Sequence, residues 1–407
     1  MQNNNNTKNE MKNKTKRHLL LLLLSGMVLT SKATDVIKQD FSTFGSINYT
    51  TTTCNGWILN KCYSRAGRTN NGLELKYISG DKIHASAESP AFSKLPENRS
   101  AILTFYYAQG ANNAPKTFTI TLNHQGTIRD AESTEMATDN TITVTTISNT
   151  EYSNKTCYIY GANTESTLTF KSEDISSNFA IIDDVVVTAV DLVSLSESEQ
   201  NSIVEEKPAD VTLTRTLRGG IWNTLCLPFD VDMTILQMAL GNDQDIQLRT
   251  FSSYEESIIR FTSTNSVSAG MPFLIKLNST VKNPTFRIVN VVTTAAQTIE
   301  YGAVSMVGVY SPTELPENGV FLSTDGMLKR PTSNSNTLAG LRAYFTLPAS
   351  LQQNARIFID NSTSGIAETE GTTVGSDDWH SLDGRRLSGR PTTKGLYICN
   401  GKKMILK

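Results

Sequence analysis

The 407-residue chain has few of the residues on which most catalytic and metal sites depend. It contains four histidines and five cysteines, and no CxxC pair that would indicate a zinc site. We find no GxSxG, HExxH, P-loop, strand-to-helix GxGxxG or complete calcium loop. These absences exclude the enzyme classes that carry a linear signature. A hydrolase that uses paired carboxylates leaves no such signature and stays an alternative.

Long apolar runs are also absent, with one exception near the start of the chain. Leu19 to Leu24 follow a basic stretch, and small residues occupy the cleavage-type positions of Ser31-Lys32-Ala33. This pattern is typical of a secretory signal peptide. We therefore expect residues 1–33 to be removed after Ala33 and the protein to be exported, either free outside the cell or on the outer cell surface. No other stretch has the length and apolar character of a transmembrane span.

The charge balance after that cleavage is acidic. Removing residues 1–33 takes away six of the 37 basic residues and one of the 39 acidic residues, leaving 31 and 38, a net charge of −7. Nucleic-acid binding depends on clustered lysine and arginine, so we expect no nucleic-acid partner. Export permits a disulfide between Cys54 and Cys62, while the other three cysteines favour small buried positions.

Residues 34–190 predict a first domain that is all β. β-rich runs at 102–107, 118–122, 142–147, 167–170 and 179–188 are separated by polar loops, and no twelve-residue stretch has a helical period. Many short strands with polar turns indicate a sandwich, because a lone sheet would leave an apolar face in water.

Weak sequence features recur along this domain in a suggestive order: Asp40-Phe41, Asn55-Gly56-Trp57, Gly72-Leu73-Glu74-Leu75, Ser89-Pro90-Ala91-Phe92, Leu103-Thr104-Phe105 and Ile182-Asp183-Asp184-Val185. Their order resembles the galactose-binding-like jelly rolls of bacterial surface proteins, including cleaved-adhesin and MAM-like modules. The resemblance implies a jelly-roll β-sandwich of the binding type.

Asp183 and Asp184 lie beside an apolar strand, where carboxylates are costly to bury without a cation or hydrogen-bond donors. In jelly rolls of the kind this domain resembles, acids near the first and last strands can hold a structural calcium ion. Asp40 can join the two from the first strand. The alternative is that one carboxylate caps a turn and the other meets solvent. We expect no cofactor apart from this calcium.

Three aromatic residues are candidates for stacking on a sugar: Trp57, Tyr106 and Tyr107. The CH face of a sugar packs well on an aromatic ring. Adjacent residues of a strand point to opposite faces, so one of the two tyrosines faces the core and the other faces outward. For Trp57 the alternative is a core position.

Residues 191–210 are rich in serine and glutamate and contain little that could be buried. This composition predicts a solvated linker between two domains. The alternative is a short exposed helix around Glu197–Glu206.

Residues 211–366 predict a second β-rich domain. Gly219-Gly220 predict a tight hairpin turn, and 232–240 predict a helix closed by Gly241. Both faces of the strand after the turn are apolar, which places Trp222 in the core. Three motifs, Trp222 to Phe229, Ala269 to Ile275 and Arg342 to Phe345, resemble a β domain of surface proteins from Gram-negative bacteria that use type IX secretion. That resemblance implies no chemistry for any residue.

Residues 367–377 predict a linker and 378–407 a short β tail. The tail contains Asp-Gly and Asn-Gly pairs, which are strong hairpin signals. It resembles the end of a type IX C-terminal sorting domain, although full sorting domains are longer. The resemblance implies a contact with the secretion machinery.

These features together predict an exported, non-catalytic surface protein with an adhesin-like module that binds a glycan, another surface polymer or a host-surface component. A secreted paired-carboxylate glycosidase and a purely structural envelope protein are the alternatives. An exposed aromatic platform favours binding, whereas two carboxylates about 5–10 Å apart in an open groove favour the enzyme.

Overall fold

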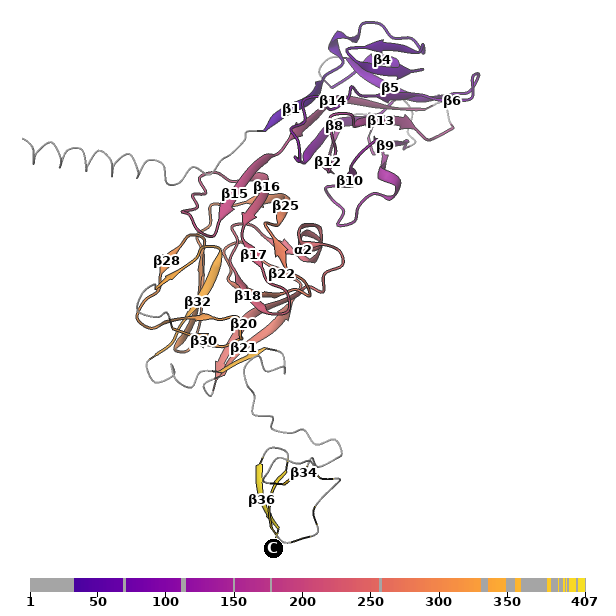
Figure 1. The fold of residues 1–407 in the computed structure, drawn as a ribbon. Coiled ribbons are helices and arrows are strands. Elements are labelled where there is room, and N and C mark those ends of the chain that lie inside the picture. Colours follow the sequence, from indigo (N-terminus) through magenta and orange to yellow (C-terminus); the bar gives the residue numbers. More distant parts are fainter. Residues whose placement is uncertain are drawn as a thin grey trace, which may run out of the picture.

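The computed structural model of the protein describes residues 33–68, 71–110, 115–148, 151–175, 178–255, 258–330, 336–348, 356–359, 379–381, 387, 391, 393, 395–399 and 402–406. Within these ranges the regular elements are strands, apart from helix α2 (Met233–Leu240) and two 3-10 turns, η1 (Ser42–Phe44) and η2 (Thr138–Asn140). The protein is therefore all-β, as predicted. A jelly-roll sandwich precedes a second β-sandwich-like domain and a short β tail (Figure 1).

The first domain consists of two antiparallel sheets packed face to face. The eight-stranded sheet has the order β10 (Thr127–Asp130), β12 (Ser153–Tyr160), β8 (Ala101–Gln109), β14 (Phe179–Ala189), β5 (Asn71–Ile78) and β4 (Tyr63–Ala66), with β1 (Thr34–Gln39) on β14 and β6 (Ile83–His84) on β5. The six-stranded sheet has the order β11 (Thr141–Thr145), β9 (Thr117–Asn123), β13 (Thr167–Ser172), β7 (Ser86–Glu88), β3 (Trp57–Asn60) and β2 (Thr52–Cys54). All five β-rich runs predicted in this domain are strands.

The core of the first domain lies between these two sheets. Trp57 is 1% exposed, with ring centroids 5.4 Å from Phe41 and 6.2 Å from Phe170. Alternate residues of each strand face inward, so the apolar residues form one continuous cluster. The remaining side chains of each strand point outward from the sandwich and are available for function.

The prediction of a linker at 191–210 is wrong at both ends of that stretch, where 191–196 and 207–210 are strands, whereas 197–206 is an irregular and largely exposed segment. β15 (Asp191–Ser196) and β16 (Lys207–Thr214) form a parallel pair, and Leu195 is fully buried in the second core. Along β15 the buried positions Asp191, Val193 and Leu195 alternate with the half-buried positions Leu192, Ser194 and Ser196, and this two-residue period is that of a strand. No helix forms over Glu197–Glu206 either. The two cores divide between Ala189 and Val193.

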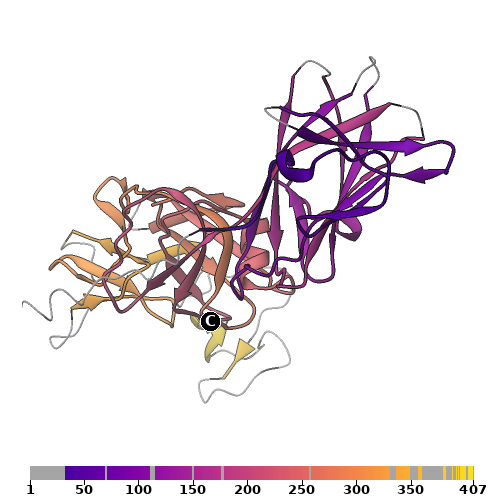
Figure 2. The ribbon, with the colours of Figure 1, turned by 90° about the horizontal axis from the view of Figure 1, so that it is seen from above.

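A buried carboxylate joins the two domains. Asp210 of β16 is fully buried, and its Oδ2 accepts the backbone N–H of Ser100 at 2.8 Å and Nη1 of Arg287 at 2.9 Å. The same Arg287 nitrogen donates to the carbonyl of Asn98 in the first domain, and Asp210 Oδ1 accepts from Ile288 N at 3.0 Å. Figure 1 shows β14 running from the first domain to β15 and β16, and Figure 2 shows the same junction from above.

The second domain has three principal sheets around two large apolar clusters and a third, small one. The first sheet has the order β15, β16 and β25 (Thr285–Val291). The second has the order β18 (Trp222–Leu225), β23 (Phe273–Lys276), β20 (Gln247–Glu255), β21 (Ile258–Thr264) and β33 (Arg356–Ile359). The third has the order β26 (Thr298–Tyr301), β27 (Val304–Val309), β32 (Arg342–Thr346), β29 (Gly319–Leu322) and β30 (Leu328–Lys329). Short pairs join β17 (Thr216–Leu217) to β24 (Val281–Lys282), β19 (Val231–Asp232) to β22 (Ser266–Val267), and β28 (Thr313–Glu314) to β31 (Thr337–Leu338).

The predicted turn and helix of this domain both form. Gly220 has φ of 77°, as the tight turn requires, although β17 and β18 pair with β24 and β23 and not with each other. Asp232 caps α2 by accepting from Ile235 N at 2.8 Å, and Gly241 ends the helix with φ of 116°.

Trp222 is less buried than the predicted core position requires. Leu225 packs in the cluster between β18 and α2, while Trp222 lies against the cluster on the other side of β18, as strand alternation requires. However, Trp222 is only half-buried, because it borders a cavity. At this end of β18 a cavity separates the strand from β29 and β32.

The tail is a three-stranded sheet of β34 (Trp379–His380), β35 (Gly395–Cys399) and β36 (Lys402–Leu406), which confirms the predicted short strands. Residues 367–377 and the predicted signal peptide up to residue 32 lie outside the described residues. Among the described helices, none has the length and apolar composition needed to cross a membrane.

Four cysteines are unbonded, Cys54 and Cys62 among them, so the permitted disulfide between these two does not form. Cys62, Cys157 and Cys226 are buried, and burial raises the pKa of each thiol to about 12. Two of the three cysteines predicted to be small buried residues are therefore confirmed. The side chain of the third, Cys399, lies outside the described residues.

Candidate functional site

The outer face of the eight-stranded sheet carries a half-buried tyrosine near its centre. Along β8, Leu103, Phe105 and Tyr107 point into the core, so Tyr106 points outward. Tyr107 is 8% exposed. The expectation that one of the two adjacent tyrosines faces outward is confirmed, and the structure identifies it as Tyr106.

An arginine–aspartate pair lies directly on Tyr106. Arg68 Cζ is 4.1 Å from the ring centroid, and Arg68 Nη2 donates to Asp184 Oδ2 at 2.8 Å. The cross-strand neighbours of Tyr106 are Asn154 on β12 and Asp183 on β14. The tyrosine thus sits among amide, carboxylate and guanidinium groups. A ring stacked on a guanidinium is a stable arrangement because the ring face attracts positive charge.

A second arginine stacks on aromatic rings at the β4 edge of the same face. Arg65 Cζ is 4.8 Å from the ring centroid of Tyr63 and 4.7 Å from that of Phe179. Its Nε donates to Glu74 Oε2 at 2.5 Å, and Tyr49 Oη donates to Glu74 Oε1 at 2.6 Å. Glu74 is fully buried, so these donors satisfy a carboxylate that water does not reach.

A third arginine stacks at the opposite edge, on β10. Arg129 Cζ is 4.9 Å from the ring centroid of Tyr158 on β12, and its Nη2 donates to Tyr160 Oη at 3.1 Å. We call this set of outward residues the aromatic–arginine face: Tyr63, Arg65, Arg68, Tyr106, Arg129, Tyr158, Phe179 and Asp184.

The charges of this face are neutralised where they are most crowded. Arg65 pairs with Glu74 and Arg68 pairs with Asp184, while the two guanidinium side chains stay 40% and 41% exposed. The hydrogen bond to Asp184 raises the pKa of Arg68, and that to Glu74 raises the pKa of Arg65. Burial, followed by Glu74, raises the pKa of Tyr49 to about 12. Arg65, Arg68 and Tyr49 therefore keep their protons near neutral pH.

The other two predicted stacking residues lie inside the sandwich. Trp57 at 1% exposure and Tyr107 at 8% have no ring face for a ligand. Trp57 takes the core position that was its alternative, because β3 places it between the two sheets. Only Tyr106 of the three predicted binding residues presents its side chain outward.

The three predicted calcium ligands have protein partners. Asp183 Oδ2 accepts from Arg68 N at 2.7 Å and its Oδ1 from Asp184 N at 2.8 Å. Asp40 accepts from Ser42 N and Oγ, as a turn cap does, and Asp184 pairs with Arg68. Across the described ranges, no three His, Cys, Asp or Glu side chains are grouped closely enough to hold a metal ion. Burial raises the pKa of Asp183, so its carboxylate depends on these two backbone donors.

These contacts also bear on the hydrolase alternative. On this face Glu74 and Asp183 are fully buried, and Asp184 is held by Arg68. A glycosidase needs two carboxylates that both reach the scissile bond. The described part of the face therefore offers no candidate pair.

Sequence reasoning missed the arginines. Arg65, Arg68 and Arg129 come from three different strands or loops, and nothing in their spacing predicts that each stacks on an aromatic ring. A partial signal exists in the alternation of Tyr158 with Cys157 and Ile159, which are buried, because it predicts an outward tyrosine on β12.

No family model and no curated protein matches this chain. Among solved structures, the CBM22-1 xylan-binding domain from Paenibacillus barcinonensis Xyn10C is 13% identical, with 39% of this chain and 96% of its own covered and a TM-score of 0.27. The CBM22-1–CBM22-2 tandem of the same protein is 8% identical, with coverages of 78% and 99% and a TM-score of 0.29. The C-terminal family 22 carbohydrate binding module of Clostridium thermocellum Xyn10B is 12% identical, with coverages of 38% and 92% and a TM-score of 0.23. Likenesses at this level assign no ligand to the chain.

Proposed function

We propose that the protein is a non-catalytic glycan-binding protein and that the aromatic–arginine face of its first domain holds the glycan. The observation that carries this proposal is Tyr106, which points outward from the middle of the sheet with Arg68 and Asp184 against it.

The chemistry of the face matches the two surfaces of a sugar. The CH face of a pyranose is apolar and packs on an aromatic ring, while its hydroxyls need both donors and acceptors. Tyr63, Tyr106 and Tyr158 supply rings from three strands. Arg68 supplies donors and Asp184 supplies acceptors in a pair whose charges cancel. The face therefore suits an uncharged glycan that crosses several strands.

The proposal includes export to the outside of the cell, because glycans of other cells or of the surroundings are met there. The basic residues, the leucine run and Ser31-Lys32-Ala33 support a signal peptide. The β tail, whose sequence resembles a type IX sorting signal, supports a contact with the secretion machinery and a place on the cell surface. The adhesin-like role follows from these two features together.

An array of neutral and acidic oligosaccharides, probed with the full-length protein, tests the proposal. The wild type should bind a set of neutral glycans, and Tyr106→Ala should lower that binding by about 30-fold, as loss of a binding hot spot of about 2 kcal/mol does. Tyr301→Ala is the matched control, since Tyr301 is a 38% exposed aromatic residue of the second domain. Equal losses for both variants, or no glycan bound by the wild type, would contradict the proposal.

A further inference from the structure

A cavity of about 380 Å³ opens in the second domain, beside the turn at Gly219-Gly220. It lies between β17 and β18 on one side and β29 and β32 on the other. Hydroxyl and guanidinium groups line it from both sides: Thr216, Arg218, Thr224, Ser323, Thr324 and Arg342. Its volume falls at the lower end of the roughly 300–1,000 Å³ typical of small-molecule sites.

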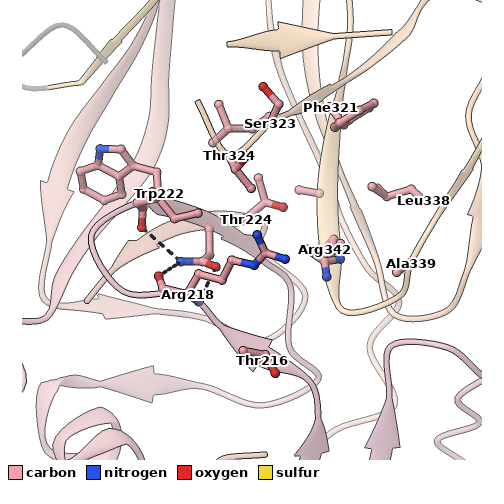
Figure 3. A pocket seen from close by; sticks show the side chains of 14 residues that line it. Thr216, Arg218, Trp222, Thr224, Phe321, Ser323, Thr324, Leu338, Ala339 and Arg342 are labelled. Carbon is pink, nitrogen blue, oxygen red and sulfur yellow. Dashed lines mark hydrogen bonds between the residues drawn. The ribbon is translucent and has the colours of Figure 1, made fainter. Parts of the chain in front are cut away.

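The lining of this cavity carries unbalanced positive charge. Among its 14 residues are two arginines and no aspartate or glutamate. Figure 3 shows the guanidinium group of Arg218 extending from its loop towards Arg342. Like charges that converge in one cavity repel each other unless an anion lies between them. The positive charge of this lining contrasts with the chain as a whole, whose formal net charge is −2.

The nearby buried groups do not cancel this charge. Glu197 is the carboxylate that contacts Arg342 Nη2, and it also lies 3.8 Å from Arg215 Nε. Arg215 is fully buried behind the cavity wall and donates to the carbonyls of Thr224 and Leu341. One carboxylate thus faces two guanidiniums. Arg218 forms no ion pair with any carboxylate of the described residues, which leaves a net excess of two positive charges.

The loop that presents Arg218 is held rigidly. Asn223 Oδ1 accepts the backbone N–H of Arg218 at 3.0 Å, and its Nδ2 donates to the carbonyls of Arg218 and Ile221 at 2.9 and 3.1 Å. A Cβ added at Gly219 would lie 2.5 Å from the backbone of Ser279, so the loop is packed tightly against its neighbour. A fixed backbone reduces the entropy that a ligand contact must overcome.

We propose that this cavity binds an anionic sugar, a pyranose that carries a carboxylate or a sulfate group. Arg218 and Arg342 receive the anion, since the guanidinium fork matches planar oxyanions with two parallel hydrogen bonds. The Thr216 and Thr224 hydroxyls receive the sugar hydroxyls. Trp222 borders the same cavity, and Arg249 and Lys276 lie over its ring at 5.4 and 5.9 Å from the centroid. This site is separate from the aromatic–arginine face, and neither depends on the other.

Calorimetric titration of the full-length protein tests the proposal with methyl glucuronide, a sulfated glucose, methyl glucoside and sodium sulfate as probes. The glucuronide or the sulfated glucose should bind, and comparison of the two identifies the source of the charge. Raising the ionic strength from about 0.1 M to about 1 M, which shortens the Debye length from about 10 Å to about 3 Å, should weaken that binding. Equal affinity for methyl glucoside, or for sodium sulfate, would overturn the proposal.

Variants locate the binding. Arg218→Ala should lower the affinity about tenfold or more, the usual loss for a charge-assisted hydrogen bond, and Arg218→Lys should fall between it and the wild type because it keeps the charge and loses the fork. Lys94→Ala removes an exposed positive charge from the first domain and should leave the affinity unchanged. Binding that survives Arg218→Ala at full strength would also overturn the proposal.

Discussion

The two domains both combine arginines with aromatic rings, and they differ in what neutralises the arginines. In the first domain Arg65 and Arg68 each have a carboxylate partner within 2.8 Å and stack on aromatic rings. Arg129, at the β10 edge of the same face, bonds Tyr160 Oη and the carbonyl of Ser133 and has no carboxylate partner among the described residues. In the second domain Arg218 has no such partner among the described residues either, and Arg342 shares Glu197 with Arg215. A paired guanidinium offers directional hydrogen bonds without net charge, whereas an unpaired one attracts anions. The same residue types therefore favour a neutral glycan at the centre of the face, around Tyr106, and an anionic sugar in the cavity.

The two sites also differ in shape, and this difference favours different ligands as well. The aromatic–arginine face crosses strands β4, β5, β14, β8, β12 and β10, so it can contact several units of a chain-like ligand. The cavity of the second domain is bordered by a short turn and by β29 and β32 and is open on one side, with room for a small molecule. An open sheet face suits a polymer, and a pocket of this volume suits a single sugar unit or a chain end.

The largest expected effect separates the two domains by their tryptophans. Trp57→Ala should destabilise the first domain by about 3–5 kcal/mol, because it removes a large aromatic side chain from a full core. Trp222→Ala should cost less, within the roughly 0.5–3 kcal/mol of ordinary substitutions, because Trp222 is half-buried beside the cavity. Thermal unfolding of both full-length variants measures this difference. Equal losses would mean that Trp222 is a core residue after all.

An intermediate effect is expected when the charge balance of the first face is altered. Asp184→Asn leaves Arg68 without its carboxylate, so the face gains one positive charge and comes to resemble the cavity. Affinity for neutral glycans should fall a few-fold, while acidic glycans should begin to bind, as measured on the same oligosaccharide array.

The matched control for that variant is Asp81→Asn, which breaks an exposed ion pair with Lys61 in the same domain. It should leave the array pattern unchanged. If both variants attract acidic glycans equally, net charge alone governs binding and the local pairing of Arg68 has no role.

The smallest expected effect concerns metal. A chelator should leave the melting temperature of the full-length protein unchanged, since Asp40, Asp183 and Asp184 are satisfied by protein donors. A ligand that binds only the folded state raises its stability, so removal of bound calcium would lower the melting temperature. A decrease on chelation would contradict this expectation, support the calcium hypothesis and reveal ligands beyond those three carboxylates.

More of the architecture than of the two candidate sites could be predicted from the sequence. Strand alternation predicts β8 and β14, and predicts that Tyr106 and Tyr107 face opposite ways, because the period of two is a local property. Asp232 and Gly241 mark the ends of α2, and helix caps are also a local property of the sequence. The linker prediction failed at 191–196 and 207–210 because the composition of the stretch is dominated by the serines and glutamates of 197–206, which lie between two strands that are each partly buried.

Contacts between distant segments set both candidate sites, and no local pattern predicts them. Arg68 meets Tyr106 and Asp184 only after β4, β8 and β14 assemble into one sheet. Arg218 and Arg342 are more than 100 residues apart in the chain and share a cavity because β17, β18 and β32 lie together. Trp222 is half-buried because it borders this cavity, and its neighbours in sequence do not predict the cavity.

The most direct test of two separate sites is a competition measurement on the full-length protein. The neutral glycan that binds most tightly on the array is titrated in the absence and presence of saturating methyl glucuronide. Because the face and the cavity use different residues from different domains, the dissociation constant for the neutral glycan should be the same in both titrations. Displacement of the neutral glycan by the glucuronide would show that one site receives both sugars and would contradict the assignment of a neutral ligand to the first domain and an anionic one to the second.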